Sequence, residues 1–291
     1  MSDEFAFLTA LRAIATHPAA AGLADDTAVL DVAAGRLVLT SDTMVAGVHY
    51  RPHDPADSIG WKLAAVNLSD LAAKGAVPVG CLLNYALSGD AGWDRAFLAG
   101  LNQALTRFAM PLLGGDTVAM PAGAPRSLTL TAFGQAQPNV PLRTGVRPGD
   151  TLWVTGTIGG AGFGPDGNPR DLARYLRPQP RVAEGQAIAA LATAMMDVSD
   201  GLLIDARRMA GASNVAITID LDAVPLAIPG LDPLEAATAG DDYELLFTLP
   251  DGAVPPVPAT RIGAASAGNG LTLTAGGAPV PLPGKLGYSH G

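Results

Sequence analysis

This 291-residue chain has a single cysteine, Cys81, only three lysines, and aromatic residues at 5% of its length. One cysteine excludes an internal disulfide framework and any zinc site that needs several cysteines. Charged residues are also scarce, at 15%, and 27 acids against 18 bases give a formal net charge of −9. Because an acidic chain repels a phosphate backbone, we do not expect general nucleic-acid binding.

Long apolar runs suited to a membrane span are missing too. The charge-free stretch 262–284 is interrupted throughout by Gly and Pro, and such a stretch cannot hold a spanning helix. The first residues include Asp3, Glu4 and Arg12, which is not the pattern of a signal peptide. We therefore expect a cytoplasmic protein that does not bind membranes. Hydrophobic residues make up 48% of the chain, which excludes disorder and allows one large domain or two ordinary ones.

Apolar periodicity alternates between helix-like and strand-like segments, which predicts a mixed α/β fold. Helices are predicted over 5–14, 57–73, 93–108, 181–194 and 202–210. Strands are predicted over 28–32, 36–40, 81–87, 112–113, 127–132, 151–155, 215–220 and 243–249, with one more ending at Met196. Only short strands and turns are expected over 249–284. The polar, proline-bearing segment 135–141 is the predicted linker, and it divides the chain into domains over 1–137 and 138–291.

The familiar nucleotide-binding loops are absent or unconvincing. The chain has no G-x-x-x-x-G-K-[ST] sequence, so it is not a Walker-type protein. A formal G-x-G-x-x-G occurs at Gly162, Gly164 and Gly167, but Pro169 stands where the next helix should begin. We interpret this match as chance rather than as a dinucleotide-binding loop.

Aspartates recur instead in turns of small residues at the predicted ends of strands. They are Asp25 and Asp26 in GLADDTAVL, Asp42 in LVLTSDT, Asp116 in LLGGDT, and Asp197 and Asp200 in MMDVSDG, with Asp70 added from a helix. Strand ends of an α/β sheet form ligand crevices, and carboxylates gathered there repel one another unless cations lie between them. Hydroxyl neighbours such as Thr40 and Ser41 make an all-oxygen donor set, which suits Mg²⁺.

Each of these aspartates also has a purely structural interpretation. Aspartate beside Gly or Ser is common in turns and N-caps, so Asp200 could only cap the following helix. Asp70 could only pair with Lys74 one helical turn away. The recurrence of one pattern favours a shared site for a polyanion. Since three lysines are few for neutralising a nucleotide triphosphate, metal ions are expected to bridge carboxylates and phosphates.

A few further side chains could bind a ligand. Arg143, which follows the linker, is either a bidentate phosphate ligand or a solvated arginine. His49 follows the segment of Asp42, an acidic cluster occupies 241–244, and Tyr288 could stack on a ring. A structural histidine, a turn at the start of a strand and an anchor for the tail are the alternatives.

Together, the motifs resemble those of the thiamine-monophosphate kinase family, in the superfamily of aminoimidazole ribonucleotide synthetase and selenophosphate synthetase. In order they are DDTAVL, LTSDTMVAGVHY, KLAAVNLSDLAAKGAVP, LLGGDT, LRTGVRPGDTLWVTGT, LRPQPR, MDVSDGL and GDDYELLFT. The resemblance implies a homodimer with the two-domain fold of that superfamily, which has mixed sheets and flanking helices. It also implies direct transfer of the γ-phosphoryl group of ATP to thiamine monophosphate, with several Mg²⁺ ions and no covalent intermediate.

The resemblance further implies roles for residues of this sequence. The implied metal ligands are Asp26, Thr40, Ser41, Asp42, Asp70, Asp116, Asp197 and Asp200. ATP contacts are implied for Gly115, Asp116, Arg143 and Ser199, and thiamine-phosphate contacts for His49, Asp241 and Tyr288. The implied catalytic set is Asp42, Asp116, Arg143 and Asp200.

The sequence departs from the family pattern in three places. Ala24 stands where Gly is usual, Asp241 replaces the Glu of G-G-E-D-Y-E, and the segment 159–169 is shorter and richer in glycine. The shorter Asp241 side chain reaches less far, and packing on the nucleotide side or in the dimer is expected to differ. Two alternatives stay open, another ATP-dependent member of the superfamily and a non-catalytic nucleotide-binding regulator. A selenophosphate synthetase would be expected to have a reactive Cys and Lys near the N-terminus, and residues 1–30 contain neither.

Overall fold

The computed structural model describes residues 3–23, 30, 32 and 35–289, and these form two compact units. Unit 1 comprises the described residues of Met1–Leu71 together with Val77–Ala136, and unit 2 those of Ala72–Ala76 and Gln137–Gly291. The short segment Ala72–Ala76 belongs to unit 2, where Lys74 Nζ donates to the carbonyl oxygens of Pro141 at 3.2 Å and Met195 at 2.8 Å. The domain ranges 1–137 and 138–291 stay a prediction.

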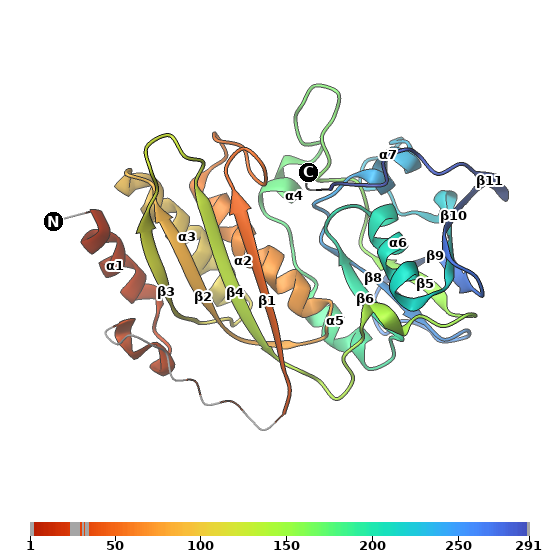
Figure 1. The fold of residues 1–291 in the computed structure, drawn as a ribbon, viewed down its shortest axis with the longest axis horizontal. Coiled ribbons are helices and arrows are strands. Elements are labelled where there is room, and N and C mark those ends of the chain that lie inside the picture. The colour runs from red at the N-terminus through yellow and green to blue at the C-terminus, as the bar shows by residue number, and fades with distance from the viewer. Residues whose placement is uncertain (1–2, 24–29, 31, 33–34, 290–291) are drawn as a thin grey trace. The chain divides into compact units, whose positions relative to one another are not determined.

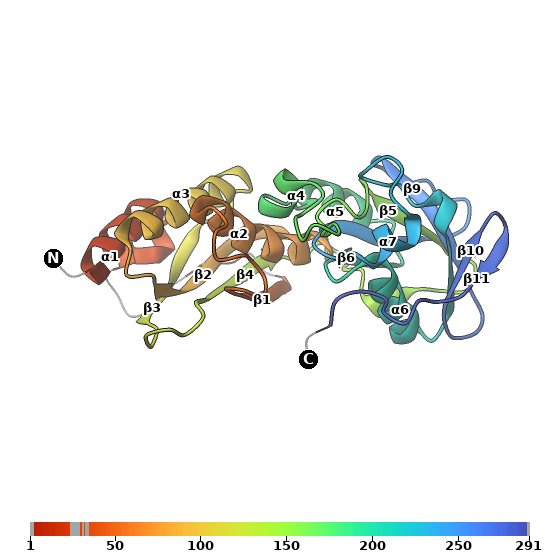
Figure 2. The ribbon, with the colours of Figure 1, turned by 90° about the horizontal axis from the view of Figure 1, so that it is seen from above.

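Unit 1 is a four-stranded sheet with its helices on one face (Figures 1 and 2). The strand order is β1 (Leu37–Val45), β4 (Ser127–Gln135), β2 (Val77–Leu87) and β3 (Leu112–Ala119). The helices are α1 (Asp3–Ile14), α2 (Ala56–Ala72), α3 (Ala91–Arg107) and the 3-10 turn η1 (Pro18–Leu23). β2 pairs with β3 in parallel, and β4 pairs with β1 and β2 antiparallel.

The strands of unit 1 bury every second side chain. On β4, Leu128 and Leu130 are fully buried beneath the helices, whereas Thr129 and Thr131 between them are only half-buried. This period of two is that of a strand with one covered face. No helix of the described residues covers the other face of the sheet (Figure 2), and we call it the bare face of unit 1.

Unit 2 is a seven-stranded mixed sheet. Its order is β11 (Ala278–Val280), β10 (Gly270–Ala275), β7 (Ala216–Asp220), β9 (Ala259–Ser266), β5 (Thr151–Thr155), β8 (Glu244–Leu249) and β6 (Ala194–Val198). Its helices are α4 (Leu172–Leu176), α5 (Val182–Ala189), α6 (Leu202–Ser213) and α7 (Pro233–Thr238), with 3-10 turns η2 (Arg143–Gly145) and η3 (Leu221–Ala223). α5 and α6 lie on opposite sides of the sheet (Figure 2), and every residue of β6 and β8 is buried.

The predicted mixed α/β class is confirmed, and most predicted elements are present. The helix predicted over 181–194 is wrong in its second half, because α5 ends at Ala189 and Asn139 Nδ2 donates to the carbonyls of Ala189 and Ala192. The tail contains more strand than expected, since β9 pairs with β7 and β5 inside the sheet. Its small residues disfavour a strand, but hydrogen bonds along both edges stabilise it. The strand predicted over 28–32 falls largely outside the described residues.

Among the described residues, no helix combines the length and the apolar character that crossing a bilayer requires.

Candidate functional site

The first group of candidate residues lies where β1 meets α2 in unit 1. The Thr40 hydroxyl donates a hydrogen bond to Asp70 Oδ2, and the backbone N–H of Asp42 donates to Asn67 Oδ1 at 3.2 Å. Asn67 is itself fixed by its Nδ2, which donates to Leu63 O within the helix at 2.9 Å. Since alternate side chains of a strand share a face, Thr40 and Asp42 both point to the helix-covered side. The structure therefore brings Thr40, Asp42 and Asp70 together.

Two carboxylates of this group, those of Asp42 and Asp70, repel each other. Burial, and next the charge of Asp70, raises the pKa of Asp42 to about 6. Oxygen ligands of this kind suit a hard cation, and Mg²⁺ typically takes one or two protein carboxylates together with water and substrate phosphates. The described residues contain no cluster of three or more His, Cys, Asp or Glu that could hold a metal alone. The group thus fits Mg²⁺ shared with a phosphate, and it does not fit a fully protein-ligated metal.

Ser41, Gly115 and Asp116 are not brought to that group. The Ser41 hydroxyl lies on the bare face, where it is 2.9 Å from that of Thr131. Asp116 is in register with Asn84 on β2, and Asn84 is in register with Thr129 on β4, so Asp116 points to the bare face as well. Asp42 and Asp116 were expected in turns at strand ends, and this is wrong, because both lie inside strands. Asp26 lies outside the described residues.

The backbone at Gly115 explains the glycine of its motif. Its φ is 150°, and a Cβ at this position would lie 1.8 Å from Leu83 O on β2. Any other residue would therefore push β3 away from β2. The pairing also shifts register between Cys81 and Leu82, so the side-chain alternation along β3 could not be read from the sequence.

His49 lies in the loop that follows β1. Its Nδ1 accepts the backbone N–H of Val45 at 3.0 Å, so a neutral ring carries its proton on Nε2. The carbonyl oxygen of His49 accepts a hydrogen bond from Lys62 Nζ at 3.4 Å. Lys62 is 3% exposed, and sequence reasoning gave it no role. A lysine inside the apolar stripe of a predicted helix was the signal that could have found it.

The second group of candidate residues in unit 2 surrounds the segment 197–201, in which β6 ends and a turn leads to α6; we call this segment the loop 197–201. The backbone N–H of Asp241 donates to Ser199 O, and that of Tyr288 donates to Asp200 O, both at 2.8 Å. Segments 40 to 90 residues apart in the sequence thus place Ser199, Asp200, Asp241 and Tyr288 around one loop. Asp197 is buried within β6, at 3% exposure.

Arg143 begins η2, which packs against α6 and β6. It is exposed at the start of η2, and its carbonyl oxygen accepts the Ser213 hydroxyl at 2.7 Å. In the part of the chain that the structure describes, its guanidinium forms no hydrogen bond or ion pair with the loop 197–201. Both interpretations of Arg143 therefore stay open.

Asp205 and Arg208 of α6 support the same loop and had no predicted role. The Asp205 carboxylate, which is fully buried, accepts the backbone N–H groups of Asp200 at 3.1 Å and Gly201 at 3.2 Å. Arg208 Nη1 binds both Asp200 Oδ2 at 2.5 Å and Asp205 Oδ1 at 2.8 Å. Burial raises the pKa of Asp205 to about 6, although Arg208 opposes that rise. An acid in the first turn of a helix after MDVSDG was the available signal.

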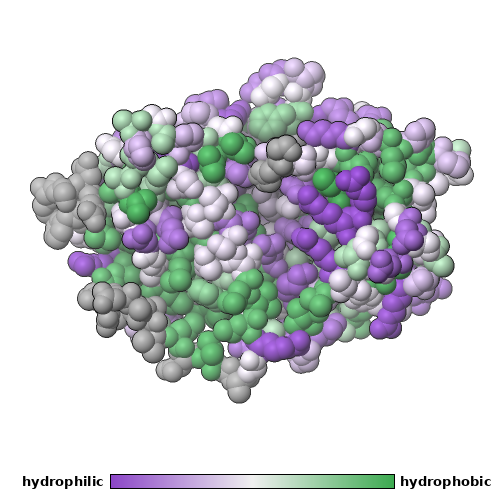
Figure 3. Space-filling view, in the orientation of Figure 1, coloured by the Kyte–Doolittle hydropathy of each residue, from purple (hydrophilic) through white to green (hydrophobic). Residues whose placement is uncertain are grey.

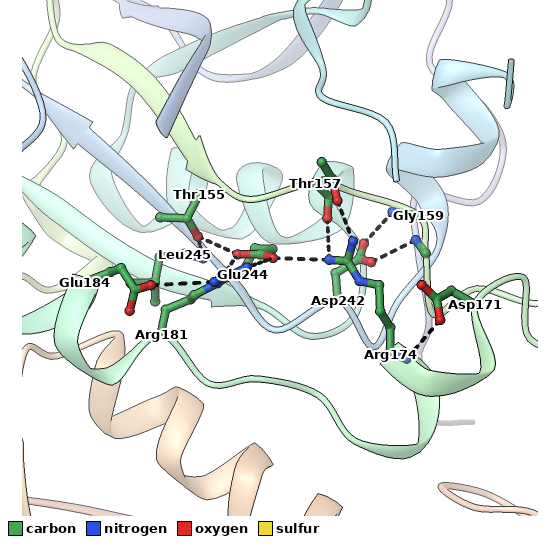
Figure 4. A network of polar contacts seen from close by, with 11 residues as sticks. Thr155, Thr157, Gly159, Asp171, Arg174, Arg181, Glu184, Asp242, Glu244 and Leu245 are labelled. Carbon is green, nitrogen blue, oxygen red and sulfur yellow. Dashed lines mark hydrogen bonds and ion pairs between the residues drawn. The ribbon is translucent and has the colours of Figure 1, made fainter. Parts of the chain in front are cut away.

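The acidic cluster 241–244 anchors a network of polar contacts (Figure 4). Glu244 accepts Thr155 Oγ1 at 2.7 Å, Arg181 Nε at 2.7 Å and Nη2 at 2.6 Å, and Arg174 Nη2 at 3.2 Å. Asp242 accepts the backbone N–H groups of Gly159 at 2.8 Å and Gly160 at 3.2 Å. Burial raises the pKa of Asp242 to about 7.

The same contacts bear on the formal G-x-G-x-x-G. The N–H groups of the glycine pair just before it bind the Asp242 carboxylate instead of a phosphate. Within the motif, Gly164 N donates to Asn168 O and Gly167 N to Gly164 O, which forms a tight turn. Because α4 begins only at Leu172, the glycines do not lead directly into the N-terminus of a helix. This geometry supports the interpretation of the match as chance.

Comparisons with known proteins agree on one family. Residues 24–136 match the family model for the AIR synthase related protein N-terminal domain, and residues 147–275 match that for its C-terminal domain. The thiamine-monophosphate kinase of Escherichia coli O157:H7 is 37% identical over 302 residues, which cover 92% of this chain and 91% of that protein.

Two solved structures resemble most of the chain. The crystal structure of thiamine-monophosphate kinase from Stenotrophomonas maltophilia K279a has a TM-score of 0.77 and 36% identity, and the match covers 86% of this chain and 89% of that one. A structure of AaThiL complexed with AMPPCP and TMP has a TM-score of 0.76 and 27% identity, with 91% of each chain covered. The predicted two-domain fold with mixed sheets and flanking helices is thereby confirmed.

Proposed function

We propose that this chain, which belongs to the thiamine-monophosphate kinase family of AIR synthase related proteins, transfers the γ-phosphoryl group of ATP to thiamine monophosphate. The products are thiamine diphosphate and ADP. The observation that carries the proposal is the 37% identity over 92% of the chain to a thiamine-monophosphate kinase. A relative that binds both AMPPCP and TMP supports the pairing of a nucleotide with this acceptor.

In this proposal the side chains of the site bind metal ions and substrates, and none of them forms a covalent bond to the phosphoryl group. Mg²⁺, when bound, neutralises charge on the transferring phosphoryl group. In unit 1, the proposed metal ligands that the geometry supports best are Thr40, Asp42 and Asp70. In unit 2, the proposed metal ligands are Asp197 and Asp200. Asp26, Ser41 and Asp116 are proposed from the family pattern. Direct transfer then requires that the acceptor phosphate be held in line.

The remaining proposed contacts divide between the two substrates. Gly115, Asp116, Arg143 and Ser199 are proposed to bind ATP, and His49, Asp241 and Tyr288 to bind thiamine monophosphate. Asp42, Asp116, Arg143 and Asp200 are the proposed catalytic residues. The proposed location is the cytoplasm, and neither nucleic acid nor a membrane is a proposed partner.

We expect Mg²⁺ to stabilise the protein against heat more strongly at about pH 7.5 than at about pH 5. Because the pKa of Asp42 is raised to about 6, the carboxyl is mainly protonated at the lower pH. A metal must then displace a proton, so its affinity falls about tenfold for each pH unit below the pKa. The measurement is the Mg²⁺-induced rise in Tm at both pH values. An equal rise at both would contradict this role of Asp42.

We also propose that the chain is a homodimer built on the bare face of unit 1. Apolar side chains gather on this face (Figure 3), and among them Leu37 and Leu39 of β1 are 42% and 63% exposed. The hydroxyl groups between these apolar residues bond to one another across the strands, as those of Thr43 and Thr129 do at 2.7 Å. An apolar sheet face of this kind is typical of an interface.

Leu39→Asp tests this interface. A carboxylate placed on the apolar face would have to lose its hydration in the dimer, so we expect the variant to be a monomer in light scattering at micromolar concentration. Val254→Asp is the matched control, because Val254 is 75% exposed and lies in unit 2. Dimers of unchanged strength in Leu39→Asp would contradict the proposed interface.

A panel of acceptors tests the substrate. The purified chain, ATP and Mg²⁺ are incubated with thiamine monophosphate, or with the acceptors of aminoimidazole ribonucleotide synthetase and of selenophosphate synthetase, and ADP release is followed. We expect release only with thiamine monophosphate. Release with another acceptor favours the first alternative, and tight ATP binding without release favours the non-catalytic regulator.

A further inference from the structure

The turn that carries Asp241 has an unusual backbone. Asp241 has a φ of 67° and Tyr243 a φ of 53°, so two non-glycine residues on either side of Asp242 are left-handed. A Cβ disfavours this conformation, and a bulky side chain such as tyrosine rarely adopts it. Such strain persists only where the surroundings enforce it, and it is concentrated at functional sites.

One set of contacts holds this turn against the loop 197–201. The backbone N–H of Asp241 donates to Ser199 O, and that of Tyr243 donates to Val198 O, both at 2.8 Å. The Tyr243 hydroxyl donates to Asp241 Oδ1 at 3.0 Å. Tyr243 is 8% exposed, so its ring has little freedom to move. The direction of the Asp241 carboxylate is thus coupled to the position of Tyr243.

A second set of contacts holds the residues that alternate with these two. Asp242 and Glu244, at 5% and 2% exposure, bind the segment 155–160 (Figure 4). Asp242 binds two backbone N–H groups there, and Glu244 binds Thr155 and two arginines. The fit is close, because a Cβ at Gly156 would lie 2.1 Å from Glu244 Oε1. The strained turn is therefore held on one side by the loop 197–201 and on the other by the segment 155–160.

We infer that Asp242 and Glu244 are positioning residues that hold the strained turn, and that Tyr243 orients the Asp241 carboxylate toward thiamine monophosphate. This inference rests on the proposed function, in which Asp241 contacts that substrate. An aspartate side chain is short, so its carboxylate reaches a substrate only if its backbone is placed accurately.

The variant Glu244→Gln tests whether Glu244 positions the turn for substrate binding or only forms a structural ion pair. The amide keeps the shape of the side chain but loses the charge that holds Arg174 and Arg181. We expect KM for thiamine monophosphate to rise roughly tenfold or more, with KM for ATP changing less than about threefold. Glu235→Gln is the matched control, because Glu235 also pairs with an arginine of unit 2, Arg170, but its side chain is 51% exposed. A KM for thiamine monophosphate equal to that of the control would overturn the inference.

Tyr243→Phe provides the test if Glu244→Gln does not fold. This variant removes only the hydroxyl that binds Asp241, and we expect a Tm close to that of the wild type with KM for thiamine monophosphate raised about threefold to tenfold. An unchanged KM would overturn the inference. If the wild type and Glu235→Gln form no thiamine diphosphate, the proposed function itself is wrong and the inference fails with it.

Discussion

Asp42→Asn is expected to lower kcat/KM for thiamine diphosphate formation about 10³-fold while the protein stays folded. The amide has the size of the carboxylate but no charge, so it cannot replace a metal ligand in a site that neutralises a transferring phosphoryl group. Asp42 and Asp70 are the two carboxylates that the structure places together in unit 1, and Thr40 binds the second of them. Loss of either charge removes much of what attracts a divalent cation.

The same variant should be more stable than the wild type in the absence of Mg²⁺. Because the folded-state pKa of Asp42 is raised to about 6, the folded protein holds this proton more tightly than the unfolded chain does. Stability is therefore lost as the pH rises from about 4 to about 6, and at about pH 7.5 the ionised carboxylate destabilises the fold. Asn removes that penalty, which is on the order of 1–3 kcal/mol. The measurements are steady-state kinetics and urea unfolding with EDTA.

Asp90→Asn is the matched control for this prediction. Asp90 is exposed in the same unit, where it caps α3 by accepting the N–H groups of Gly92 and Trp93, and asparagine caps helices equally well. Activity and stability of the control should match the wild type. Full activity of Asp42→Asn would remove Asp42 from the proposed ligands, and a marked fall in its stability would show a role in the fold instead.

Asp205→Ala is expected to be the most destabilising of the substitutions considered. It leaves the N–H groups of Asp200 and of the buried Gly201 without their acceptor, and it removes one of the two carboxylates that Arg208 binds. The cost is on the order of 3–5 kcal/mol, which corresponds to a fall in Tm of roughly 6–20 °C for a unit of this size. Since the loop 197–201 carries Ser199 and Asp200, activity should fall as well, even well below the new Tm.

Calorimetry and kinetics on three variants test this prediction. Asp205→Asn keeps one acceptor oxygen and should lose less stability than Asp205→Ala. Asp251→Ala, in an exposed turn of unit 2, should behave as the wild type. A Tm for Asp205→Ala within about 2 °C of the control would show that the loop does not depend on this carboxylate.

Sequence reasoning identified the chemistry of the site better than its geometry. In the helix predicted over 57–73, Asn67 and Asp70 are three residues apart and so share a face, and the structure directs both toward β1. The face of the sheet on which Asp116 lies could not be predicted, because it depends on a register shift between β2 and β3. The order of the motifs revealed the family. The face of the sheet to which each side chain points depends on the pairing of the strands, which the sequence does not show.

The supporting residues were missed for a different reason. Glu244 and its partners Arg174 and Arg181 are 63 to 70 residues apart in the sequence, and no local pattern joins them. The acidic cluster 241–244 is visible in the sequence, but the left-handed backbone of Asp241 and Tyr243 has no signature there, because neither residue is a glycine. Long-range ion pairs and local strain are decided by tertiary packing, which periodicity does not report.

The most direct measurement of the central claim is the formation of thiamine diphosphate itself. The purified chain is incubated with ATP, Mg²⁺ and thiamine monophosphate, and the thiamine phosphates and nucleotides are separated and quantified over time. We predict that thiamine diphosphate and ADP form in equal amounts, and that neither forms with EDTA. ADP without thiamine diphosphate, or no turnover beside an active control kinase, would contradict the account.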